Sequence, residues 1–137
     1  MSATNFIYRK APKAPSKSSI ELSAHGALRM QERLHIMSQA EMRDHLYKVR
    51  YIKGINIDSV NMSNYAEYGI PENVLHYIKM YPHYNTQGHR TYLYNEFIYF
   101  FTGKQSRKFI TVVKLPDELC CGAQYSRSQI RLSQEDR

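Results

Sequence analysis

After a polar leader, the first half of the chain places apolar residues at helical spacing. The first such stretch runs from residue 23 or 24 to residue 34, with Ser23 as its N-cap. A second helix begins at a capping box formed by Ser38 and Glu41. Its apolar stripe consists of Met42, Leu46 and Val49. Only residues 35–37 join the two helices, so the pair must fold back on itself or cross sharply.

Alternating and β-branched apolar residues dominate the second half of the chain. They predict three strands, at 90–94, 96–102 and 108–115. Asn95 is the expected pivot of the first turn, and residues 103–107 form the second. Such short connections require an antiparallel meander, to which the middle of the chain could add a fourth strand. The two N-terminal helices are available to cover one face of this sheet.

Between these regions, residues 53–85 carry a weaker pattern of scattered Gly, Asn and Ser. One short helix is expected there, starting at Pro71 and ended by Pro82. The predicted fold class is therefore α+β, with two N-terminal helices packed on an antiparallel β-meander and an additional short helix in a mid-chain insertion. The expected organisation is a flexible basic arm at 1–20, a single domain at 21–116 and a polar C-terminal tail at 117–137.

The formal charge of the 137-residue chain is +7, which favours an anionic partner such as nucleic acid. Four of the positive charges lie in residues 1–20, so the remainder of the chain is only mildly basic. Cys120 and Cys121 are adjacent, which suits neither an ordinary disulfide nor a tetrahedral metal site. We expect reduced thiols, no metal or other cofactor, and a cytoplasmic protein without a membrane span.

One histidine and two arginines share one side of the first helix. His25, Arg29 and Arg33 follow one another at intervals of four residues, which aligns their side chains. An imidazole beside two guanidinium groups is suited to a phosphate. The competing interpretation is an ordinary solvated helix face, on which Glu32 and Arg29 only interact with water.

The residues around this stripe match the signature Ser-x-His-Ala-x-x-Arg-Met-x-Glu-Arg. The matching positions are Ser23, His25, Arg29, Met30, Glu32 and Arg33, with Gly26 in place of the alanine. Together with His45, twenty residues after His25, this segment resembles the RelE-like endoribonucleases of the barnase, EndoU and colicin-nuclease group. That family includes phage early-messenger endoribonucleases and small toxin-like domains. Residues 53–85 have no counterpart in the resemblance.

The resemblance implies a RelE-like fold and metal-independent cleavage of single-stranded messenger RNA in a bacterial or phage-infected cell. It also implies that His25 and His45 are catalytic and that Arg29 contacts phosphate. A toxin-like member would need an acidic inhibitor to cover its basic face, and the ribosome is a further candidate partner.

The chemistry of RNA cleavage agrees with this assignment. Without a metal, a base must accept the 2′-hydroxyl proton, an acid must protonate the leaving 5′-oxygen, and a cation must stabilise the phosphorane. His25 and His45 supply the base and acid, and Arg29 and Arg33 supply the cations. The products would be a 2′,3′-cyclic phosphate and a 5′-hydroxyl. A competing interpretation places His45, beside the apolar stripe, in a hydrogen bond under the helix pair.

Candidate RNA-binding residues lie on and around the meander. They are Lys104, Arg107, Lys108, Thr111, His89, Arg90, Tyr92 and Tyr94. The basic residues and Thr111 would contact phosphates, and the tyrosines, with Tyr99 as a further candidate, would stack on bases. A metal site at His83 and His89 is an alternative, but it lacks carboxylate or cysteine partners, and we expect these two residues to border the RNA groove. The alternative function is a non-catalytic regulator that binds nucleic acid or a host protein.

Overall fold

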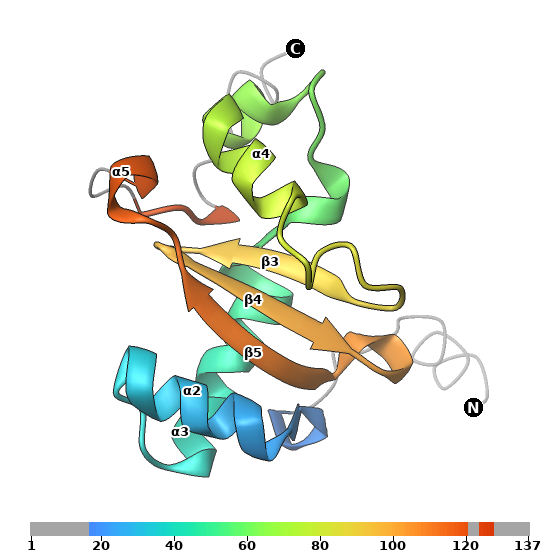
Figure 1. The fold of residues 1–137 in the computed structure, drawn as a ribbon. Coiled ribbons are helices and arrows are strands. Elements are labelled where there is room, and N and C mark those ends of the chain that lie inside the picture. Colours follow the sequence, from blue (N-terminus) through green and yellow to red (C-terminus); the bar gives the residue numbers. More distant parts are fainter. Residues whose placement is uncertain (1–16, 121–123, 128–137) are drawn as a thin grey trace, which may run out of the picture.

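Five strands form a mixed, open sheet with helices on both faces, as the computed structural model shows for residues 17–120 and 124–127 (Figure 1). Along the sheet the strand order is β1-β5-β4-β3-β2. The strands are β1 (Glu21–Leu22), β2 (Ile55–Asn56), β3 (Arg90–Tyr94), β4 (Phe97–Thr102) and β5 (Lys108–Lys114). The predicted α+β class is confirmed.

The α-helices in the described part of the chain are α2 (Ala24–Leu34), α3 (Gln39–Tyr47), α4 (Glu72–Lys79) and α5 (Asp117–Cys120). Helix α3 continues into a π-helical segment, η2 (Lys48–Lys53). Short 3-10 turns occur at η1 (Lys17–Ser19), η3 (Ile57–Ser59), η4 (Tyr65–Tyr68) and η5 (Lys104–Ser106).

Serine caps fix the starts of the first two helices. The Ser23 side chain accepts a hydrogen bond from the Gly26 amide at 2.9 Å, and the Ser38 side chain accepts one from the Glu41 amide at 3.0 Å. Helix α2 ends where His35 adopts a left-handed conformation with φ of 59°. The predicted starts of both helices are therefore confirmed.

Strands β3, β4 and β5 form the predicted meander, with Asn95 at the first turn (φ 55°). The prediction of a purely antiparallel sheet is wrong, because β1 pairs in parallel with the start of β5. A strand of two residues carries no alternation pattern, so it leaves no signal in the sequence. The predicted fourth strand from the middle of the chain is β2, which pairs with β3.

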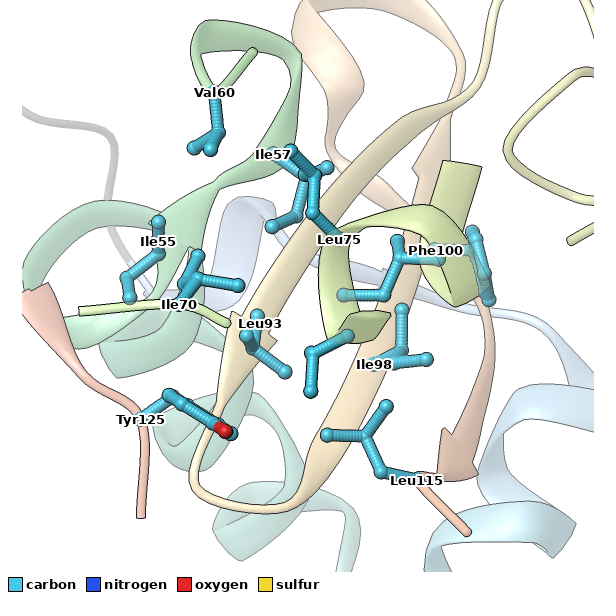
Figure 2. Packing of buried hydrophobic residues seen from close by; sticks show 12 residues of the cluster. Ile55, Ile57, Val60, Ile70, Leu75, Leu93, Ile98, Phe100, Leu115 and Tyr125 are labelled. Atoms are coloured by element: carbon cyan, nitrogen blue, oxygen red, sulfur yellow. The ribbon is translucent and has the colours of Figure 1, made fainter. Parts of the chain in front are cut away.

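Each face of the sheet has its own apolar core. The core under α2 and α3 consists of Ile20, Met30, Met42, Leu46, Val49, Tyr92, Tyr99, Phe101, Phe109 and Val112. The core under α4, drawn in Figure 2, consists of Ile55, Ile57, Val60, Ile70, Val74, Leu75, Ile78, Leu93, Ile98, Phe100, Leu115 and Tyr125. The mid-chain insertion therefore covers the face that the N-terminal helices leave open.

The predicted boundaries of the domain are too narrow. Ile20 is only 1% exposed, its carbonyl accepts a hydrogen bond from Arg43, and Lys17 forms an ion pair with Asp44 at 2.5 Å. At the other end, Tyr125 is 3% exposed and its backbone pairs with Asn95. Segments on both sides of the predicted domain thus belong to its core.

The rest of the expected arm, at residues 1–16, lies outside the described residues, as do the side chains of Cys120 and Cys121 and the end of the tail at 128–137. Within the described residues, no helix combines the length and apolar character that crossing a membrane requires.

Candidate functional site

His45 lies beneath α3, against the sheet, and not at a site shared with His25. Its Nε2 lies 2.7 Å from the hydroxyl of Tyr99, which is 1% exposed, and its ring packs on those of Tyr99 and Tyr94. Burial lowers the pKa of His45, and the neighbouring Lys48 lowers it further. Burial also raises the pKa of Tyr99, so its hydroxyl stays protonated and shares a hydrogen bond with the imidazole. The structure thus places His45 in a hydrogen bond under α3, and its catalytic pairing with His25 stays a prediction.

His25 lies on the first turn of α2, exposed to solvent, beside the start of β5. Ser23 anchors this turn, because its amide donates to the Phe109 carbonyl and its hydroxyl donates to the Ile110 carbonyl, both at 3.4 Å. Ser23 therefore both caps helix α2 and binds its start to strand β5. The backbone that carries His25 is thereby fixed relative to the sheet.

The turn segment between α4 and β3 supplies two more imidazoles. The rings of His83 and His89 are stacked, with centroids 5.7 Å apart and 16° between their planes. His83 also packs on Phe100 of β4, at 5.1 Å. The hydroxyl of Thr102 donates to the Gly88 carbonyl at 3.2 Å, which ties the segment to the end of β4.

We call His25, His83 and His89 the histidine cluster: the rings of His83 and His89 are stacked, and the charge of His25 acts on His83. Burial lowers the pKa of His83, and the charges of His89 and His25 lower it further. Each of the other two imidazoles is therefore close enough to His83 to influence its protonation. The cluster joins the start of α2 to the segment before β3, which are more than fifty residues apart in the chain.

A backbone contact sets the tautomer of His89. Its Nδ1 lies 3.1 Å from the carbonyl oxygen of His83. Because a carbonyl oxygen only accepts, Nδ1 must carry the proton and donate it. In the neutral state the remaining nitrogen, Nε2, then has a free lone pair and is ready to act as a base.

The two arginines of the predicted stripe have different partners. Arg29 forms an ion pair with Glu32 at 2.6 Å, and its side chain is 31% exposed. Arg33 donates a hydrogen bond to the Val112 carbonyl of β5, which assigns it a structural contact at the edge of the sheet. Since an exposed ion pair contributes at most about 1 kcal/mol, a phosphate can replace Glu32 as the partner of Arg29.

The predicted basic residues gather at one end of the sheet, where β3 begins, β4 ends and β5 begins. Lys108 pairs with Thr102, and Lys104 and Arg107 lie in the connecting hairpin. Arg90 is exposed at the first position of β3 and lies near Asp58, where its charge opposes the rise in the pKa of Asp58 that burial causes. His89 precedes Arg90 directly, so this basic end adjoins the histidine cluster.

Two of the predicted RNA contacts are wrong, and two aromatic candidates lie away from this end. Tyr92 is 2% exposed and Thr111 is 3% exposed, so neither side chain is accessible to RNA. Tyr99 is buried as well, as a member of the core under α2 and α3. Tyr94 lies at the opposite end of β3 and packs on His45.

The sequence pointed to His83 and His89 only as the border of a groove, whereas in the structure their rings stack and the charge of His25 acts on His83. The signal was a pair of histidines flanking a short turn-rich segment. Among the described residues, no three His, Cys, Asp or Glu side chains are grouped closely enough to hold a metal ion. The groups that lie at this end of the sheet are imidazoles and cationic side chains.

Comparisons with protein-family models, with curated proteins and with solved structures gave no match to this chain.

Proposed function

We propose that this protein is a metal-independent endoribonuclease that cleaves single-stranded, messenger-type RNA. The histidine cluster is its centre of proton transfer, and the basic end of the sheet binds the RNA backbone. The observation that carries the proposal is that the stacked rings of His83 and His89 adjoin the cationic end of one sheet, where Ser23 also anchors the helix turn that carries His25. Histidine is the side chain whose ordinary pKa allows it to accept and donate protons near neutral pH.

In this mechanism, Nε2 of His89 accepts the proton of the 2′-hydroxyl, and the freed oxygen attacks the adjacent phosphorus. His25 donates a proton to the departing 5′-oxygen, which leaves a 2′,3′-cyclic phosphate and a 5′-hydroxyl. Arg29 and Lys108 stabilise the negative charge on the phosphorane oxygens. Each positioned proton donor or acceptor contributes a factor of about 10²–10⁴ to the rate.

His83 is a positioning residue in this scheme. Its carbonyl fixes the tautomer of His89, and its ring supports the His89 ring from one side. Because burial and the neighbouring imidazoles favour its neutral form, His83 adds little positive charge that would oppose protonation of His89.

The arrangement of elements supports a RelE-like relationship as part of the same proposal. Helices α2 and α3 are followed by the meander of β3, β4 and β5, which is the order that the sequence resemblance implies. Strand β1 and the segment that carries α4 are additions to that arrangement. The second of these additions brings His83 and His89 to the site.

The test is incubation of the purified chain with end-labelled single-stranded RNA in EDTA, followed by analysis of the product ends. We expect 2′,3′-cyclic phosphate ends, and a loss of cleavage of at least about 100-fold in His25→Ala and in His89→Ala. His76→Ala, at an exposed position on α4, is the matched control and should retain the activity.

His45→Gln separates this proposal from the pairing expected from the sequence. It should retain cleavage at a temperature where the variant is folded, since His45 lies outside the histidine cluster and packs on Tyr99 and Tyr94. RNA that is bound but stays intact would contradict catalysis and favour the non-catalytic regulator. Cleavage that depends on His45 and not on His89 would contradict the assigned site.

A further inference from the structure

An open pocket of about 520 Å³ lies at the basic end of the sheet, beside the hairpin that joins β4 to β5. Ser19, Glu21, Lys104, Gln105 and Arg107 line it. The pocket is formed where β1 joins the β4–β5 hairpin, because the Glu21 amide donates to the Arg107 carbonyl at 2.9 Å. Its size is in the range of sites for small ligands.

One donor at this pocket has no partner. The Nε of Arg107 is buried and makes no hydrogen bond within the described residues. A buried N–H without an acceptor is costly, by about 1–3 kcal/mol, so such a group calls for an explanation. A rotation of the half-buried Arg107 side chain toward the pocket would bring this N–H to an anionic ligand, which would supply the missing acceptor.

The walls of the pocket restrict what that ligand can be. Lys104 is exposed beside Arg107, and together they present two cations. Arginine and lysine are the usual partners of phosphate oxygens. Glu21 adds one negative charge, which weakens the attraction of the pocket for any anion. Removing this charge should therefore strengthen anion binding.

The pocket is also close to the histidine cluster. Glu21 precedes His25 by four residues, and at about 3.3–3.6 Å per extended residue their backbones are at most about 14 Å apart. On the other side, Lys108 follows Arg107 and pairs with Thr102, whose hydroxyl binds Gly88 of the His83–His89 segment. One short strand of RNA can therefore reach both places.

We propose that this pocket is a phosphate subsite, in which Arg107 and Lys104 bind a backbone phosphate next to the scissile one. The inference rests on the proposed function, because it names the substrate of the same site as an oligonucleotide longer than a dinucleotide. It assigns Arg107 Nε to one non-bridging oxygen of that flanking phosphate.

The experiment measures binding of a hexanucleotide of deoxyuridine, which has no 2′-hydroxyl and so cannot be cleaved by the proposed route. Fluorescence anisotropy over a series of salt concentrations gives the affinity and its salt dependence. For Arg107→Gln, we expect weaker binding and a slope of log K against log salt reduced by about 0.7, the value for one phosphate contact to a single strand. Lys114→Gln, at the opposite end of β5, is the matched control for the loss of one positive charge.

Two further measurements do not depend on the folding of the arginine variant. Glu21→Gln should tighten binding of the hexanucleotide, because it removes the opposing charge. In the full-length wild-type chain, the ¹⁵N–¹H signal of Arg107 Nε should shift on titration with the hexanucleotide. A signal that does not move, or equal behaviour of Arg107→Gln and Lys114→Gln, would overturn the subsite.

Failure of the subsite and failure of the proposed function give different results. If RNA is cleaved with dependence on His25 and His89 while Arg107→Gln leaves KM for RNA unchanged, the subsite is refuted and the nuclease stands. If Arg107→Gln and Glu21→Gln change binding in opposite directions but no RNA is cleaved, the subsite stands and the nuclease is refuted.

Discussion

The hydroxyl of Tyr99 lies 2.7 Å from Nε2 of His45, in the layer between α3 and the sheet. This hydrogen bond joins a helix to the central strand β4 and satisfies two polar groups that would otherwise be costly to bury. His45 therefore contributes to folding, and its protonation should be measurable as a change in stability.

Acid should destabilise the protein through His45. Because burial lowers its pKa in the folded state below the unfolded value of about 6.5, the unfolded chain takes up the proton first as the pH falls. The stability present above about pH 6.5 is then lost with a slope of up to about 1.4 kcal/mol per pH unit. Urea denaturation at several pH values from about 8 to 5 measures this loss.

His45→Gln should flatten that dependence. His83 also has a lowered pKa and contributes with the same sign, so the quantity to compare is the difference between the wild type and the variant. A wild type and a variant with parallel pH dependence would show that His45 titrates alike in the folded and unfolded states.

Gly26→Ala should destabilise the protein, although alanine ordinarily favours a helix by about 1 kcal/mol over glycine. A Cβ at position 26 would lie 2.7 Å from the Phe109 ring and 2.9 Å from the Ser23 hydroxyl. We expect a net loss of about 1–3 kcal/mol from this overpacking, measured by chemical denaturation.

Phe109→Leu provides the test of that cause. In the Phe109→Leu background, Gly26→Ala should cost clearly less than in the wild type, which a double-mutant cycle detects as a favourable coupling. Additive effects of the two changes would mean that the ring of Phe109 is not what excludes alanine.

Gly54→Ala should disrupt the end of the π-helical segment. Its Cβ would lie 2.2 Å from the Val49 carbonyl oxygen, which already accepts the Gly54 amide at 2.9 Å. Backbone atoms cannot move aside as a flexible side chain can, so we expect a loss of at least about 3 kcal/mol. Gly88→Ala, where the space is open but φ is 85°, should cost only about 1–3 kcal/mol in backbone strain.

Tyr125→Ala should destabilise the whole domain by about 3–5 kcal/mol, because the ring is buried in the core under α4. Gln124→Ala, at the exposed neighbouring position, is the control and should change the stability by less than about 0.5 kcal/mol. Thermal unfolding of the two variants provides the comparison. Equal midpoints would show that residues 124–127 do not stabilise the domain.

The helices and the meander could be predicted because their signals are local. Ser23 and Ser38 mark the helix starts through caps that involve residues only three positions away, and Asn95 marks a tight turn. Strand β1 could not be predicted, because its two residues depend on pairing with β5, some eighty residues later. Tyr125 is a similar case, since its burial depends on Asn95.

Helical spacing correctly predicted that His25 lies on an exposed first turn of a helix. It could not show which side chains from other segments lie near His25. His45 follows Met42 by three residues, which puts it on the buried face of α3, so the interpretation that it is hydrogen-bonded under the helix pair was the correct one. His83 and His89 lie in turns, where no periodicity indicates the direction of a side chain. Their approach to His25 is a product of the tertiary fold alone.

Strand β1 pairs with only the first two residues of β5, so the rest of β5 is an edge of the sheet. The unpaired backbone groups of an edge strand can form hydrogen bonds with a strand of another chain. Here the Ile110 carbonyl accepts from Ser23 and the Val112 carbonyl accepts from Arg33, so helix α2 occupies the hydrogen-bonding positions that an incoming strand would need. The helix that presents His25 to solvent thus also covers this edge of the sheet.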